Sequence, residues 1–101
     1  MTLKAAFIFV APDADAAVHR AVIDTPVVKL TAVGVKNYAA AVEVARQMAA
    51  EGFAAIELCA GFGLEGAALV KQAVAGKAAV GVVRFDNHPG LGFKSGDDIF
   101  A

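Results

Sequence analysis

Residues 54–85 read AAIELCAGFGLEGAALVKQAVAGKAAVGVVRF, and this stretch decides the fold. An apolar run over 54–60 predicts a strand, a glycine-rich turn leads into a predicted helix over 64–75, and Gly76 closes that helix. A second apolar run over 78–85 predicts another strand. Because strands separated by a helical crossover pair in parallel, the stretch predicts an α/β fold.

The rest of the chain extends the same pattern. The predicted strands are 3–11, 27–35, 54–60 and 78–85, and the predicted helices are 16–22, 38–50 and 64–75. This βαβαβαβ pattern predicts one α/β domain over residues 1–101. Its four-stranded parallel sheet has the order 2-1-3-4, with helices on both faces. The alternative is a half-barrel of successive βα units with the order 1-2-3-4.

Composition narrows the class of protein. Of the 101 residues 58% are hydrophobic and 19% charged, which excludes a disordered chain, and the net charge is −1. No basic stripe is present to bind nucleic acid, and no apolar run approaches the ~20 residues of a membrane helix. Surplus apolar surface on so small a domain favours a homo-oligomer. The single cysteine, Cys59, indicates a reducing, cytoplasmic setting.

Residues 61–66, GFGLEG, fit the pattern G-x-G-x-x-G between a predicted strand and a predicted helix. Free amides at a glycine-rich helix N-terminus attract negative charge, so Gly61, Gly63 and Gly66 are candidate ligand-binding residues for a small anion. Asp86, twenty positions after Gly66, lies where a dinucleotide fold would place a ribose-binding acid. A dinucleotide is not favoured, since only one strand follows this unit. The cofactor stays undetermined.

Polar residues lie on the last two predicted strands and just beyond them. Glu57 and Arg84 each interrupt an apolar strand, and Asp86 and His88 follow the last one. Since ligand sites of α/β proteins lie at the carboxyl edge of the sheet, Glu57, Asp86 and His88 are candidate catalytic bases and Arg84 a candidate anion ligand. An ion pair between Glu57 and Arg84 that only fixes strand register is the structural alternative. No metal-ligand spacing is present.

Four segments resemble a bacterial family of small single-domain α/β proteins of unknown function. They are AAFIFVAP (5–12), HRAVIDTP (19–26), AIELCAGFG (55–63) and GVVRFDNHPG (81–90). The resemblance covers nearly the whole chain and implies a small, soluble, single-domain protein. It implies no cofactor and no catalytic residue.

Two hypotheses about function follow. The first is a small-molecule site at the carboxyl edge of the sheet, which as an enzyme would transfer a proton next to a carbonyl or phosphate. The second is a structural or regulatory homo-oligomer, in which the glycine-rich tail from Asn87 onward packs as an arm instead of closing over a ligand. The first requires Glu57, Arg84, Asp86 and His88 to line one pocket; the second has them paired with each other or buried between subunits.

Overall fold

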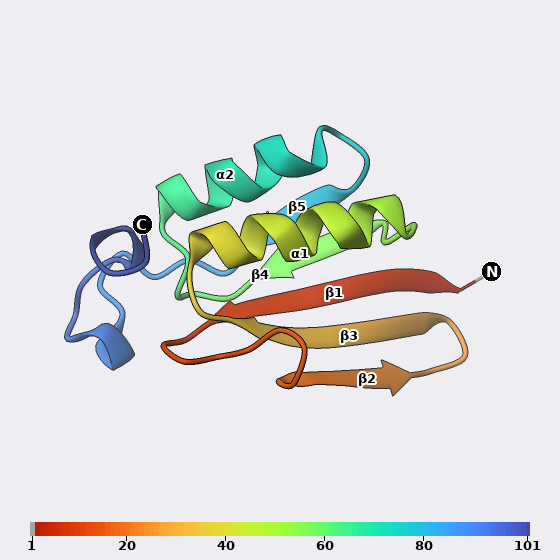
Figure 1. Cartoon of the computed structure of the whole chain (residues 1–101), viewed down its shortest axis with the longest axis horizontal. Coiled ribbons are helices and arrows are strands. Elements are labelled where there is room, and N and C mark those ends of the chain that lie inside the picture. Colours follow the sequence, from red (N-terminus) through yellow and green to blue (C-terminus); the bar gives the residue numbers. More distant parts are fainter. Residues whose placement is uncertain (1) are drawn as a thin grey trace.

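The computed structural model describes residues 2–101 and consists of a five-stranded sheet with two helices packed on it (Figure 1). The elements in chain order are β1 (Leu3–Val10), β2 (Arg20–Asp24), β3 (Val28–Val35), α1 (Tyr38–Ala50), β4 (Ala55–Leu58), α2 (Leu64–Val74) and β5 (Ala79–Val82). Two short 3₁₀ turns follow, Pro89–Leu91 and Gly96–Asp98.

The sheet has the order β2-β3-β1-β4-β5. β3, β1, β4 and β5 run in parallel, and β2 pairs with β3 in the antiparallel direction. The order predicted for the four parallel strands is therefore confirmed, and the half-barrel order is excluded. The prediction of a purely parallel, four-stranded sheet is wrong, because β2 adds a fifth strand at the edge.

The fifth strand comes from the segment predicted to be the first helix. Residues 16–22 do not form a helix: turns cover the first part, and β2 begins at Arg20. A helix of seven residues is marginal in water, whereas Val22 and Ile23 are β-branched and suit a strand. Pairing with β3 gives this segment a ladder of backbone hydrogen bonds, which decides the outcome.

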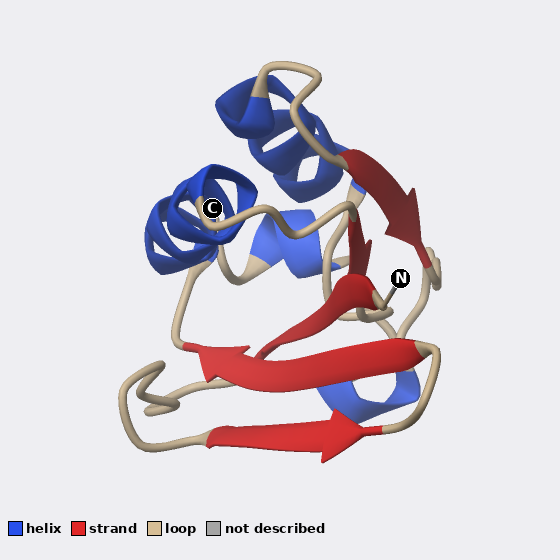
Figure 2. Ribbon diagram, turned by 90° about the vertical axis from the view of Figure 1, so that its right-hand side faces the viewer, coloured by secondary structure: helices blue, strands red, loops and turns tan. Residues whose placement is uncertain are grey.

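Both helices lie on the same face of the sheet, as Figure 2 shows from the side. The connections β3–α1–β4 and β4–α2–β5 cross the sheet in the same direction, so right-handed crossovers place both helices on one face. The connection from β1 to β3 runs the other way and would have carried a helix to the second face. It contains β2 instead, so the prediction of helices on both faces is wrong.

The core lies between the sheet and the helices. Ile8, Val33, Ile56 and Leu58 point toward the helices and are fully or almost fully buried. Residues that stand opposite each other in neighbouring strands share a face of the sheet. We call the opposite side the open face; its strand residues are Leu3, Ala5, Phe7, Phe9, Ala21, Ile23, Val28, Leu30, Ala32, Gly34, Ala55, Glu57, Ala79 and Gly81.

Candidate functional site

The glycine-rich turn before α2 is occupied by the chain's own tail. The carboxylate of Asp97 accepts hydrogen bonds from the backbone N–H groups of Glu65 (3.2 Å) and Gly66 (3.3 Å). The hydroxyl of Tyr38 donates to the same carboxylate at 2.8 Å and accepts from the N–H of Gly63 at 3.0 Å. The first-turn amides of α2 thus bind an anion, but that anion is a side chain of this protein.

The glycines of this region make room for the tail. A Cβ at Gly63 would collide with the Asp97 carboxyl, and one at Gly96 would collide with the carbonyl oxygen of Gly61. A Cβ at Gly66 would stand 2.5 Å from the Tyr38 ring. The G-x-G-x-x-G pattern is therefore explained by internal packing. An external anion would reach these amides only if Asp97 moved away.

Tyr38 links the tail to the core. Its ring is buried and stacks on Phe62, with 5.5 Å between ring centroids, and a tilted contact to Phe100 follows at 6.4 Å. Burial raises the pKa of Tyr38 far above its ordinary value, and the neighbouring carboxylate of Asp97 raises it further. The phenol therefore stays neutral and donates its proton to the Asp97 hydrogen bond.

Arg84, Asp86 and His88 do not converge with Glu57. Arg84 pairs with Asp86 at 2.7 Å on the surface beyond β5. His88 begins the turn that contains Pro89, where its Nδ1 accepts a hydrogen bond from the N–H of Gly90 at 2.9 Å and its ring packs on Phe85. The four candidate residues therefore do not line a shared pocket.

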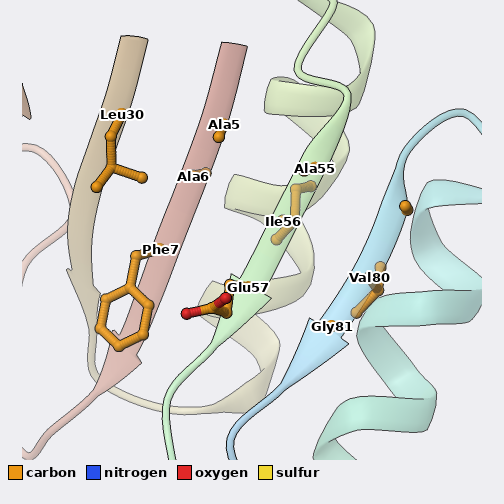
Figure 3. A pocket seen from close by; sticks show the side chains of 10 residues that line it. Ala5, Ala6, Phe7, Leu30, Ala55, Ile56, Glu57, Val80 and Gly81 are labelled. Atoms are coloured by element: carbon orange, nitrogen blue, oxygen red, sulfur yellow. The ribbon is translucent and has the colours of Figure 1, made fainter. Parts of the chain in front are cut away.

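Glu57 lies apart from them, on the open face. It lines a depression of about 490 Å³ between β3, β1, β4 and β5 (Figure 3). Three alanines, Ala5, Ala55 and Ala79, stand opposite one another in adjacent strands and form the floor. Gly81 continues that floor beside Glu57, and the larger side chains of Phe7 and Leu30 rise on one side.

Glu57 is the only charged strand residue on the open face of the described chain. It forms no ion pair with Arg84, whose side chain pairs with Asp86. The register-fixing ion pair considered from the sequence is therefore absent from residues 2–101, and Glu57 faces the depression alone.

The remaining reactive residues have local partners. The Sγ of Cys59 accepts a hydrogen bond from the N–H of Gly61 at 3.2 Å, and the Nδ1 of His19 accepts one from the N–H of Asp15 at 2.8 Å. Nowhere in residues 2–101 do three or more His, Cys, Asp or Glu side chains gather closely enough to hold a metal ion. No helix in that range has both the length and the apolar character needed to cross a bilayer.

Among models of protein families, that of DUF6506, a family of unknown function, matches residues 3–98. The chain belongs to this family. The match confirms that the chain belongs, as the sequence suggested, to a family of unknown function. Neither the curated proteins nor the solved structures contain a significant match to the chain.

Two features of the structure are not predicted from the sequence: the contact between Tyr38 and Asp97, and the uncovered open face of the sheet. Neither Tyr38 nor Asp97 is among the candidate site residues that the sequence indicates. Their pairing depends on a contact across 59 positions, for which no local pattern exists. The open face could have been inferred from one feature of the sequence: from Ala5 to Val10, β1 is apolar at both its odd and its even positions, as in a strand buried on both sides.

Proposed function

We propose that this protein is a self-assembling structural or regulatory module, and that the open face of its sheet is the contact surface between copies. The observation that carries the proposal is the pattern of β1. Phe7 and Phe9 are as apolar as Ile8 and Val10, yet only the face with Ile8 and Val10 is covered by helices. A strand of this composition is normally buried on both sides.

The size and relief of the open face support a second copy as its cover. With strands about 4.8 Å apart and about 3.3 Å of rise per residue, five strands up to eight residues long present on the order of 500 Å² in projection. Side-chain relief raises the accessible area toward the ~800 Å² per partner of a standard interface. Phe7 and Leu30 form a ridge beside the alanine floor, and a two-fold axis would set the ridge of one copy into the depression of the other.

Sedimentation velocity on wild type and on Phe7→Glu tests the proposal. The wild type is expected to sediment as an oligomer at micromolar concentration. Phe7→Glu should shift it to a smaller species, because the new carboxylate would be buried against apolar side chains and next to Glu57. Leu69→Glu is the matched control, since Leu69 is a 45% exposed apolar residue on α2, away from the open face. A monomeric wild type, or equal loss of mass in both variants, would contradict the proposal.

The depression around Glu57 favours a second candidate function, a binding site for a small molecule. Its apolar walls and single carboxylate suit a ligand with an apolar body and one cationic group. Phenethylamine is a suitable probe, with binding followed by NMR shifts of Ala55, Glu57 and Gly81. Loss of those shifts in Glu57→Gln would support this candidate, and unchanged wild-type spectra at millimolar probe would reject it.

A further inference from the structure

We propose that two copies of the chain also pair edge to edge through β2. The two β2 strands would run antiparallel about a two-fold axis at Val22 and join the sheets into one continuous sheet. β2 is the outer strand of the sheet, and all five of its residues are exposed. The side chains of Ala21 and Ile23 belong to the open face, but the pairing proposed here uses the outer backbone edge of β2 and the side chains of Arg20 and Asp24, so it does not depend on the proposal above.

The hydrogen-bonding groups of β2 point outward at the right residues. The carbonyl of His19 accepts from the N–H of Gly34 at 2.8 Å, and the N–H of Thr25 donates to the carbonyl of Val28 at 2.9 Å. The backbone N–H and C=O groups of the odd-numbered residues of this segment therefore point toward β3. Those of the even-numbered residues point away from β3. The free edge is thus formed by both backbone groups of Val22 and Asp24 and by the carbonyl of Arg20, whose N–H donates to the carbonyl of Val18 at 3.0 Å.

Pairing of two β2 strands about Val22 matches both the backbone hydrogen-bonding groups and the side-chain charges of the two copies. Val22 would exchange both backbone hydrogen bonds with its own copy, and Arg20 would stand opposite Asp24 of the partner subunit. Opposite charges facing each other across antiparallel strands attract, and the symmetry supplies two such pairs. The Nε of Arg20 donates to the carbonyl of Ala16 at 3.1 Å, which leaves its two terminal amino groups for the partner.

Exposed apolar side chains gather along the same edge. Three of the six most exposed large apolar residues lie on or beside β2 and outside the open face: Val18 (69%), Val27 (67%) and Val22 (52%). Edge strands that must stay unpaired usually carry charged side chains, above all lysine, or proline or a bulge; the two charges of β2, Arg20 and Asp24, have opposite signs and attract each other in the paired register. The sequence of β2, RAVID, contains neither lysine nor proline, and its register with β3 runs without interruption.

Charge exchange tests the register directly. Arg20→Asp alone places two acidic residues opposite each other at both ends of the paired strands, and Asp24→Arg alone places two basic ones there. Each change turns two attractions into repulsions, and should raise the dissociation constant of the edge contact at least about tenfold. An equimolar mixture of the two variants restores opposite charges at every pair. Sedimentation at low salt should therefore show lighter species for each variant and recovery of the wild-type mass for the mixture.

A cross-link provides a readout that does not depend on mass or on the open face. Val22→Cys places two thiols opposite each other at the axis, with Cα atoms about 5.5 Å apart, within the range of a disulfide. Val27→Cys is the matched control, because Val27 lies in the turn between β2 and β3, beyond the end of the strand, and two copies of that position would lie at least about 20 Å apart in this register. Under mild oxidation, Val22→Cys should form a covalent dimer, and Val27→Cys and wild type, with Cys59 alone, should not.

The outcomes separate this proposal from the preceding one. Phe7→Glu, which tests the open face, should leave the Val22→Cys cross-link unchanged. If Val22→Cys and Val27→Cys cross-link equally or not at all, or if the mixture of charge variants stays as light as its components, the β2 pairing is wrong whatever the open face does.

Discussion

At the scale of single residues, Asp97 has the role that an external anion was expected to have. Its carboxylate accepts hydrogen bonds from the backbone N–H groups of Glu65 and Gly66 at the start of α2 and from the hydroxyl of Tyr38. Carboxylates are favourable at this end of a helix because they oppose the partial positive charge of the free amides. The physical chemistry that suggested a ligand site is therefore present, but it holds the tail in place.

Asp97→Ala should lower the free energy of unfolding by about 2–3 kcal/mol, since it removes hydrogen bonds to a charged group and leaves the Tyr38 hydroxyl without its acceptor. Urea unfolding would measure the change. Asp98→Ala is the matched control, because the Asp98 side chain is exposed and makes no such bonds in the described chain. Sulfate should stabilise Asp97→Ala more than wild type, because the vacated amides can then bind it; equal effects of sulfate on both proteins would contradict the masking of an anion site by Asp97.

Tyr38 should make the fold sensitive to alkaline pH. Its pKa is raised in the folded state, mainly by burial and further by Asp97, so the folded protein holds the phenolic proton more tightly than the unfolded chain does. The stability from this group is therefore complete below the unfolded-state pKa, about 10, and is lost as the pH rises above it. Tyr38→Phe should be less stable than wild type at pH 7, yet its stability should fall less steeply above pH 10. Parallel pH profiles would show that Tyr38 is not the group responsible.

At the scale of elements, α2 packs closely against Tyr38 of α1 because Gly66 has no side chain. Gly66→Ala should destabilise the protein by about 1–3 kcal/mol, because the added methyl group overlaps the Tyr38 ring, and this outweighs the better helix propensity of alanine. Gly81→Ala is the matched control: its Cβ would meet nothing within 4 Å, so the change should be neutral or slightly stabilising. Thermal unfolding at low protein concentration compares the two, and similar losses in both variants would refute the packing argument.

The elements that could be predicted from the sequence are those with long apolar runs and clear ends. The four parallel strands and their order follow from such runs. α1 has the predicted bounds, 38–50, and Asn37 caps its start by accepting a hydrogen bond from the N–H of Ala40 at 2.9 Å. Residues 16–22 were misassigned because a short segment carries almost no periodicity, and pairing with β3 decided its structure. Of the candidate site residues, the strand pattern alone could not show that Arg84 would pair with Asp86 beyond β5 instead of with Glu57.

At the scale of the whole molecule, one connection determines which surface is left uncovered. The segment between β1 and β3 lies in the plane of the sheet as β2, so no helix crosses to the open face. The apolar residues, 58% of the chain, therefore lie partly in the one covered core and partly on exposed surfaces, among them the open face and the β2 edge. The strands are thus largely apolar on both faces of the sheet, but within a single copy only one face is covered.

The melting temperature of the wild type should therefore depend on protein concentration. Subunits that bind only in the folded state stabilise it by mass action, so raising the concentration from the micromolar to the hundred-micromolar range should raise the melting temperature by several degrees, corresponding to about 2–3 kcal/mol. Phe7→Glu should reduce this dependence, since it removes the open-face contact and retains the monomer core. Leu69→Glu should retain it in full. If the wild type melts at the same temperature throughout that range, the exposed apolar surfaces do not serve self-association, and the binding of a small molecule beside Glu57 becomes the stronger candidate.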